Sequence, residues 1–119
     1  MNTYQIKIAD SDLASRQGAA ELRAQIEDRV SVGGKISLDL GDVFSVSESY
    51  ADELFGVLAL RYGLEWLSEH VGLHNLNPFV FRAIASAIRQ RLLSRSPEAP
   101  DVALLAARKA LKQRQSRNI

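Results

Sequence analysis

The sequence predicts a small α/β domain with a largely parallel sheet, in the order β-α-β-α-β-α and with an extra C-terminal helix. Three short segments alternate apolar and polar residues, as half-buried strands do. Between them lie segments whose apolar residues recur every three or four positions, as on one face of a helix. Strands that alternate with helices favour right-handed parallel crossovers, and 119 residues is an ordinary length for one domain.

The first half of the chain contains two predicted strands and the helix between them. Residues 4–8 alternate in hydrophobicity and predict the first strand. Residues 19–30 keep a helical spacing, and Gly33 and Gly34 are expected to end that helix as a left-handed cap. Residues 35–40 alternate again and predict the second strand.

A loop of small polar residues, 41–49, separates the second strand from the second predicted helix. That helix covers residues 51–62 and ends at Gly63. Ser49 and Asp52 have the spacing of a capping box, so we expect the helix to begin there.

The remaining elements follow in the same order. Residues 64–70 fit either a continuation of the second helix or a connection, and residues 71–73 predict a short third strand. Asn77 and Pro78 are typical of an N-cap and a first helical position, and the apolar stripe that follows continues to Leu92.

Two prolines separate this α/β domain, residues 1–95, from a basic C-terminal helix or tail, residues 96–119. Residues 1–96 hold ten Lys and Arg against twelve Asp and Glu, whereas residues 97–119 hold five against two. Any electrostatic attraction to a polyanion is therefore expected at the C-terminus.

The inward faces of these elements predict the hydrophobic core. Its expected members are Ile6, Ile8, Leu22, Ile26, Ile36, Leu38, Leu54, Phe55, Leu58, Phe81, Ile84 and Ile88.

Composition excludes several classes of protein. Without cysteine there is no disulfide, thiolate metal site or cysteine nucleophile. There is no apolar run long enough to span a membrane, and the first residues lack the pattern of a signal peptide, so we expect a cytoplasmic protein without a membrane partner.

Metal binding is the weaker of two interpretations wherever candidate ligands occur. His70 and His74 are four apart but have no evident third ligand, and half-buried or surface histidines are favoured. A cluster of five acidic residues around the end of the second strand could hold Mg²⁺: Asp39, Asp42, Glu48, Asp52 and Glu53. Helix capping and solvation explain Asp52 and Glu53 without a metal, and this interpretation is favoured. No nucleophile–histidine–acid set is recognisable, so we expect neither an enzyme nor a cofactor.

The loop before the second helix carries three hydroxyls, those of Ser45, Ser47 and Ser49. A phosphate on one of them would face the positive end of the helix. N-capping by Ser47 or Ser49 is the simpler interpretation, and spacing alone favours it.

Residues 36–56, which read ISLDLGDVFSVSESYADELFG, resemble the signature of the STAS-like family, a bacterial domain family of unknown function. The start of the first helix, residues 15–23, also matches, and the similarity extends over residues 4–93. That family is similar in turn to the anti-sigma factor antagonists, which are compact α/β domains.

The resemblance implies a regulatory role and a phosphoacceptor. In the antagonists, a partner kinase phosphorylates the second serine of an Asp-Ser-Ser-Gly motif, which corresponds to Ser49. Ser47, Glu48 and Tyr50 stand at the other three positions. The expected partner-binding loop and helix start comprise Ser45, Ser47, Glu48, Ser49, Tyr50, Asp52 and Glu53.

Three classes of function remain open. The first is a regulatory protein-interaction module that binds a histidine-kinase-like ATPase of the anti-sigma type, and homodimerisation also stays open. The second is a nucleic-acid-associated regulator that uses the basic C-terminal helix, although a solvated tail is favoured. An enzyme with an acidic metal site ranks last.

Overall fold

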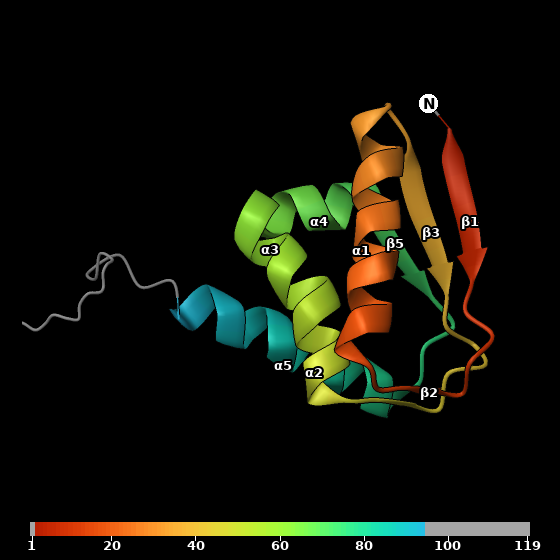
Figure 1. Ribbon diagram of the computed structural model, residues 1–119, viewed down its shortest axis with the longest axis vertical. Helices are drawn as coiled ribbons and strands as arrows, with labels where there is room; N and C mark the ends of the chain where they lie inside the picture. Colours follow the sequence, from red (N-terminus) through yellow and green to blue (C-terminus); the bar gives the residue numbers. More distant parts are fainter. Residues whose placement is uncertain (1, 95–119) are drawn as a thin grey trace, which may run out of the picture.

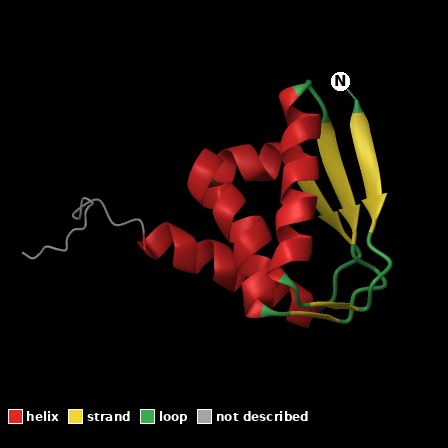
Figure 2. Ribbon diagram, viewed as in Figure 1, coloured by secondary structure: helices red, strands yellow, loops and turns green. Residues whose placement is uncertain are grey.

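Three parallel strands form the main sheet, and a layer of helices covers one of its faces (Figures 1 and 2). The computed structural model describes residues 2–94. The strands are β1 (Thr3–Lys7), β3 (Lys35–Asp39) and β5 (Val71–His74), in the spatial order β1-β3-β5. The predicted α/β class with a parallel sheet is confirmed.

The register of the sheet explains the alternation of its residues. Tyr4 pairs with Ile36, and Ile36 pairs with Val71, so apolar side chains of neighbouring strands share the face below the helices. Ile36 and Val71 are buried, whereas Lys35 is exposed on the opposite face. That opposite face carries polar residues such as Gln5, Lys7 and Ser37, and no helix of residues 2–94 covers it (Figure 2).

A second, two-stranded ladder lies at the carboxyl end of the main sheet. Strand β2 (Asp12–Leu13) pairs in parallel with β4 (Ser45–Val46). This ladder was not predicted, because two residues are too few for an alternation of apolar and polar side chains to be visible. The ladder fixes the segment that leads into the second helix.

The helical layer contains α1 (Arg16–Ser31), a long bent run, α4 (Leu64–His70) and α5 (Pro78–Ser94) (Figure 1). The bent run consists of α2 (Glu48–Ala51), the π-helical turn η1 (Asp52–Gly56) and α3 (Val57–Tyr62). Gly63 ends α3 with a positive φ of 96°, so α4 is a separate helix and does not continue the run.

The helix starts are set by side chains that accept backbone hydrogen bonds. The Ser15 hydroxyl accepts from Gly18 N, and the Asn77 side chain accepts from Val80 N at 2.8 Å, as predicted for Asn77. The predicted capping box of Ser49 and Asp52 is wrong, because the N-cap of α2 is Ser47.

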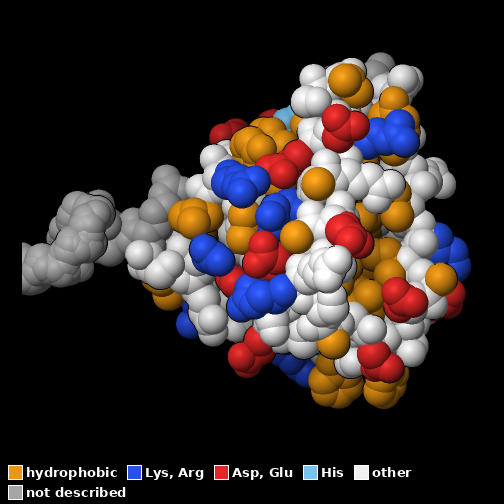
Figure 3. Space-filling model, viewed as in Figure 1, with side chains coloured by type: hydrophobic (Ala, Val, Ile, Leu, Met, Phe, Trp, Pro, Cys, Tyr) orange, Lys and Arg blue, Asp and Glu red, His pale blue; other side chains and the backbone are white. Residues whose placement is uncertain are grey.

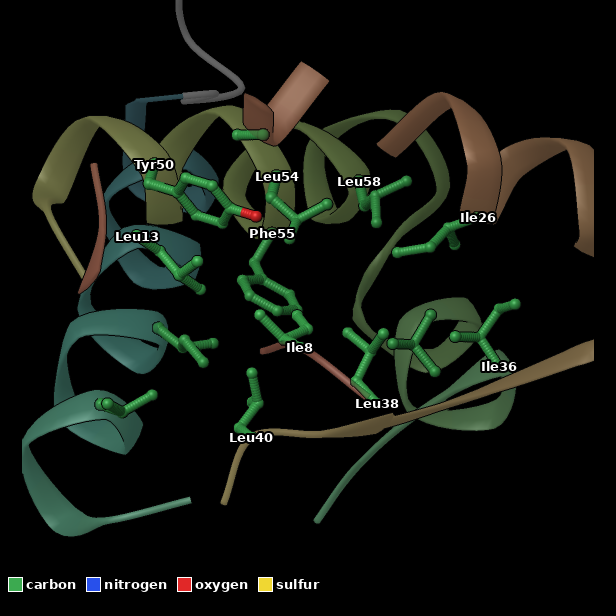
Figure 4. Close-up of a cluster of buried hydrophobic side chains, with 14 of the residues drawn as sticks. Ile8, Leu13, Ile26, Ile36, Leu38, Leu40, Tyr50, Leu54, Phe55 and Leu58 are labelled. Atoms are coloured by element: carbon green, nitrogen blue, oxygen red, sulfur yellow. The ribbon is translucent and has the colours of Figure 1, made fainter. Parts of the chain in front are cut away.

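The core lies between the sheet and the helices, with contributions from almost every element (Figure 4). Eight predicted members are buried: Ile8, Ile26, Ile36, Leu38, Leu54, Phe55, Leu58 and Ile84. Ile6, Leu22 and Ile88 pack against this core and are partly buried. The prediction of Phe81 as a core residue is wrong, because its side chain is 57% exposed, whereas Val80 is fully buried.

The error at Phe81 has a geometric cause. In the first turn of α5, Val80 points at the core, and the residues on either side of it lie about 100° away around the helix. Both Phe79 and Phe81 are therefore exposed. The predicted C-terminal helix and its basic residues lie outside the described residues.

Candidate functional site

The loop before α2 is held in place by the small β2–β4 ladder. The Ser45 hydroxyl donates to Asp12 Oδ1 at 2.6 Å, across the ladder. The Ser47 hydroxyl donates to the carbonyl of Ala14 at 3.1 Å and accepts from Tyr50 N at 3.1 Å. Two of the three loop hydroxyls are thus committed to local structure.

Ser49 differs from the other two serines. It lies in the first turn of α2, is half-buried, and its hydroxyl makes no hydrogen bond to any residue between 2 and 94. It lines a surface cavity of about 420 Å³ between α1, α2 and α5. The lining residues are Arg16, Glu48, Ser49, Asp52, Gln90, Arg91 and Ser94.

Asp52 lies beside Ser49 in this cavity and is held by two arginines. Arg91 donates two hydrogen bonds to Asp52, from Nε to Oδ1 at 2.7 Å and from Nη2 to Oδ2 at 3.0 Å. Arg16 approaches Oδ2 at 3.4 Å. Because Arg91 donates to the charged form, the pKa of Asp52 lies below its ordinary value of 3.8.

Glu53 extends this ion-pair network toward α1. Arg23 Nη1 lies 2.7 Å from its Oε2 and also donates to its backbone carbonyl, while Arg16 Nη1 lies 3.0 Å from its Oε1. The hydrogen bond from Arg23 lowers the pKa of Glu53. Figure 3 shows acidic and basic side chains side by side over the helical layer.

The π-helical turn and Gly56 bring α5 close enough for this network. A Cβ atom at Gly56 would lie 2.8 Å from Arg91 Cγ, 2.9 Å from Asp52 Oδ1 and 3.3 Å from the carbonyl of Ala87. The absence of a side chain there lets Arg91 cross the helix run and reach Asp52. π-turns inside helices occur frequently at functional sites.

The structure brings only part of the predicted loop and helix start to the surface. Glu48 and Ser49 line the cavity, and Ser45 lies at the edge of the ladder. Tyr50, however, is 6% exposed and belongs to the core, where burial raises the pKa of its hydroxyl. Its aromatic character is thus explained by packing (Figure 4).

Sequence reasoning missed the cations that complete the site. Arg16 and Arg23 are seven residues apart, so they share one face of α1 and could have been matched to the adjacent acids Asp52 and Glu53. Arg91 lies in the helix that begins at Pro78, but no local spacing connects it with Asp52, which stands 39 residues earlier.

The two histidines have separate surroundings. His70 Nδ1 lies 2.9 Å from the carbonyl of Trp66, and its ring is tilted against the Trp66 ring. His74 lies on β5, with its ring over Gly72 on the open face of the sheet.

Four of the five candidate carboxylates form two groups with different partners, and the fifth, Glu48, lines the Ser49 cavity. Asp39 and Asp42 both pair with Lys7, at 3.7 and 3.4 Å, at the carboxyl end of the sheet. A hydrogen bond from Gly41 N lowers the pKa of Asp39. Asp52 and Glu53 face arginines instead, and no group of three or more candidate metal ligands occurs within residues 2–94.

A family model described as a STAS-like domain of unknown function matches residues 18–80, which is just over half of the chain. The chain matches neither a curated protein nor a solved structure. Among the helices of residues 2–94, none has the length and apolar character that crossing a membrane requires.

Proposed function

The chain belongs to the family of STAS-like domains, and we propose that it is a regulatory protein-binding module that presents the start of α2 to a partner. The proposed partner is a histidine-kinase-like ATPase of the anti-sigma type, by similarity to the anti-sigma factor antagonists. The observation that carries the proposal is the state of Ser49. Its hydroxyl stands in a surface cavity without an intramolecular hydrogen bond to any described residue, whereas Ser45 and Ser47 are both engaged.

Phosphorylation of Ser49 is the proposed switch. A phosphate adds about −1.5 to −2 charge at neutral pH. Arg16 and Arg91 line the same cavity, but each is already paired with Asp52, and Glu48 lines the cavity too. The added charge would therefore compete for both arginines and would present a dianion to any partner that fits a neutral hydroxyl.

The fold should survive this modification. The cap of α2 is made by Ser47, and the Ser49 hydroxyl supports no other described residue. The change would thus be confined to the binding surface, as a reversible switch requires.

A binding role, and not catalysis, is what we infer for these residues. The support is that both carboxylates accept hydrogen bonds from arginines: Asp52 from Arg91, and Glu53 from Arg23. A carboxylate held in ion pairs with a lowered pKa is a poor general base and a poor free ligand for a metal ion.

The test compares the partners that three forms of the chain retain from a lysate of the source cells. Wild type and Ser49→Ala should retain the same ATPase, and Ser49→Asp should lose it, while all three keep one cooperative thermal transition. Ser68→Asp is the matched control, because exposed Ser68 lies on α4, at the far end of the helical layer from α2 (Figure 1). Equal retention by Ser49→Asp and Ser68→Asp would reduce Ser49 to a passive position in the first turn.

A further inference from the structure

Ser49, Asp52 and Glu53 lie on one face of the helical run that begins at α2. Asp52 and Glu53 follow Ser49 by three and four residues, the spacing at which side chains on a helix are neighbours. Helical pairing of the backbone continues across this stretch, because Asp52 N donates to the carbonyls of Glu48 and Ser49. A side chain from another helix that reaches both acids therefore comes within about one turn of the Ser49 hydroxyl.

Arg16, at the start of α1, is such a side chain. Its Nη1 atom lies 3.0 Å from Glu53 Oε1 and 3.4 Å from Asp52 Oδ2. Arg16 is also the residue of α1 that lines the cavity containing Ser49. A phosphate on Ser49 would thus meet α1 at Arg16.

The starts of α1 and α2 are fixed to each other just before Arg16 and Ser49. The Ser47 hydroxyl donates to the carbonyl of Ala14 at 3.1 Å, and Ser47 N donates to the carbonyl of Leu13 at 2.8 Å. Neither bond involves the Ser49 side chain, so both should persist when Ser49 is modified. We therefore expect the response to a phosphate in side chains, and not in the positions of the two helices.

The cavity is electrically balanced before any modification. Its two arginines, Arg16 and Arg91, stand against Glu48 and Asp52, so it offers a free anion no net attraction. A phosphate bonded to Ser49 is different, because it is placed there covalently. Its charge would be repelled by both carboxylates unless a cation turned toward it.

Arg91 is held more firmly in this cavity than Arg16. Arg91 uses Nε and Nη2 for two hydrogen bonds to Asp52, and its side chain is 33% exposed. Arg16 is 57% exposed and uses Nη1 alone. The Nε and Nη2 atoms of Arg16 form no hydrogen bond within residues 2–94. Arg16 therefore has the free donors, and also the room to turn.

A phosphate is a better partner for Arg16 than the carboxylate of Glu53. It carries about −1.5 to −2 charge at neutral pH, and the planar guanidinium can donate to two of its oxygens at once. Glu53 would still keep an arginine after the exchange, because Arg23 Nη1 lies 2.7 Å from its Oε2. Asp52 would keep Arg91, so the exchange leaves no carboxylate of this network unpaired.

We propose that Arg16 is the residue that receives a phosphate on Ser49: it leaves Glu53 and pairs with the phosphate, while Arg91 stays on Asp52. The inference rests on the proposed function, in which the γ-phosphoryl group of ATP passes to Ser49 Oγ, with loss of the hydroxyl proton and release of ADP. It deepens that function, because the two states of the site then differ at Glu53 and at the start of α1 as well as at Ser49. A partner that distinguishes the two states would contact both helices.

The test uses the full-length chain with phosphoserine inserted at position 49 during translation, so no kinase is needed. ³¹P NMR at a series of pH values measures the pKa of the second ionisation of the phosphate, which is about 6 for a free phosphoserine. Contact with Arg16 favours the dianion, so this pKa should lie below that value. Arg16→Gln should raise it by at least about half a pH unit.

Arg61→Gln is the matched control. Arg61 is 50% exposed, and its Nη1 atom pairs with one carboxylate oxygen, Glu27 Oε2, at 2.9 Å, much as Arg16 pairs with Glu53. It lies on α3 and does not line the Ser49 cavity. This variant removes the same charge but should change the phosphate pKa less than half as much, because the distance is longer and salt screens it.

A spectrum of ¹⁵N-labelled arginine side chains separates the two cations of the cavity. Phosphoserine at position 49 should shift the Nε–H signal of Arg16 more than that of Arg91. The Arg16 signal is assigned by its loss in Arg16→Gln.

Two results would overturn the proposal. Equal changes of the phosphate pKa in Arg16→Gln and Arg61→Gln would show that no contact with Arg16 forms. A larger shift of the Arg91 signal would assign the phosphate to Arg91. Neither measurement uses the ATPase, so Arg16 can fail here while the proposed switch holds, and the switch can fail in the lysate while Arg16 receives the phosphate.

Discussion

Replacement of Gly56 by alanine should destabilise the protein, although the residue lies in the middle of a helical run. Helix propensity alone predicts the opposite sign, because alanine is favoured over glycine inside a helix by up to about 1 kcal/mol. The structure predicts destabilisation because a methyl group at this position would lie under 3 Å from both Arg91 Cγ and Asp52 Oδ1.

The magnitude follows from which atoms would have to move. Arg91 Cγ lies near the base of a side chain whose far end is fixed on Asp52 by two hydrogen bonds, and the carbonyl of Ala87 is backbone. Overpacking of this kind costs about 1–3 kcal/mol. Once a propensity gain of about 1 kcal/mol is subtracted, the expected net loss is centred on about 1 kcal/mol, which is roughly 4–8 °C in thermal midpoint for a domain of this size.

Urea unfolding followed by the fluorescence of the single tryptophan, Trp66, would measure this loss. Trp66 is half-buried and stacks on Tyr62 with ring centres 4.2 Å apart, so it reports on packing of the helical layer. Gly18→Ala in α1 is the matched control, because its Cβ would meet nothing nearer than 3.4 Å. It should be neutral or stabilising. If Gly56→Ala raised the midpoint as Gly18→Ala does, the close approach of α5 would be wrong.

Three further outcomes follow from the structure. Leu54→Ala should cost about 2–5 kcal/mol of unfolding free energy, because Leu54 is buried. Phe81→Ala, at an exposed position, should cost under about 1 kcal/mol. Chemical denaturation would measure both, and a large loss for Phe81→Ala would mean that the buried face of α5 is assigned wrongly. Because hydrogen bonds from Arg91 and Arg23 depress the pKa values of Asp52 and Glu53 below 3.8 and 4.5, their contribution to stability is present above those values and is lost as the pH falls through the folded-state values. Acid titration of Asp52→Asn should therefore show a shallower loss than wild type, and an unchanged slope would remove Asp52 from the network. Removal of residues 97–119 should leave one cooperative thermal transition, since the core residues named above all lie within residues 2–94, and a broadened transition would contradict this.

Local patterns predicted the frame of the fold because each element carries its own periodicity. The three strands of the main sheet alternate, and α1 and α5 show a helical spacing, so their order and the parallel sheet were predictable. The position of Asn77 before Pro78 also fixed the start of α5 within one residue.

The site itself depends on contacts that no local pattern contains. Asp52 and Glu53 looked like acids of a first turn, because their partners Arg91, Arg16 and Arg23 lie at least 30 residues away in sequence. The choice of Val80 over Phe81 as the buried residue of the first turn of α5 was similarly invisible. Both residues are apolar, and only packing against the sheet selects between them.

If the start of α2 is the regulated binding face, hydrogen exchange of the captured complex should show protection there. With the wild-type chain bound to its ATPase partner, peptides that cover residues 45–53 should exchange more slowly than in the free chain. The same peptides of Ser49→Asp, mixed with that partner, should exchange at the rate of the free chain. Protection confined to the open face of the β1-β3-β5 sheet, with residues 45–53 unchanged in the wild-type complex, would contradict the account.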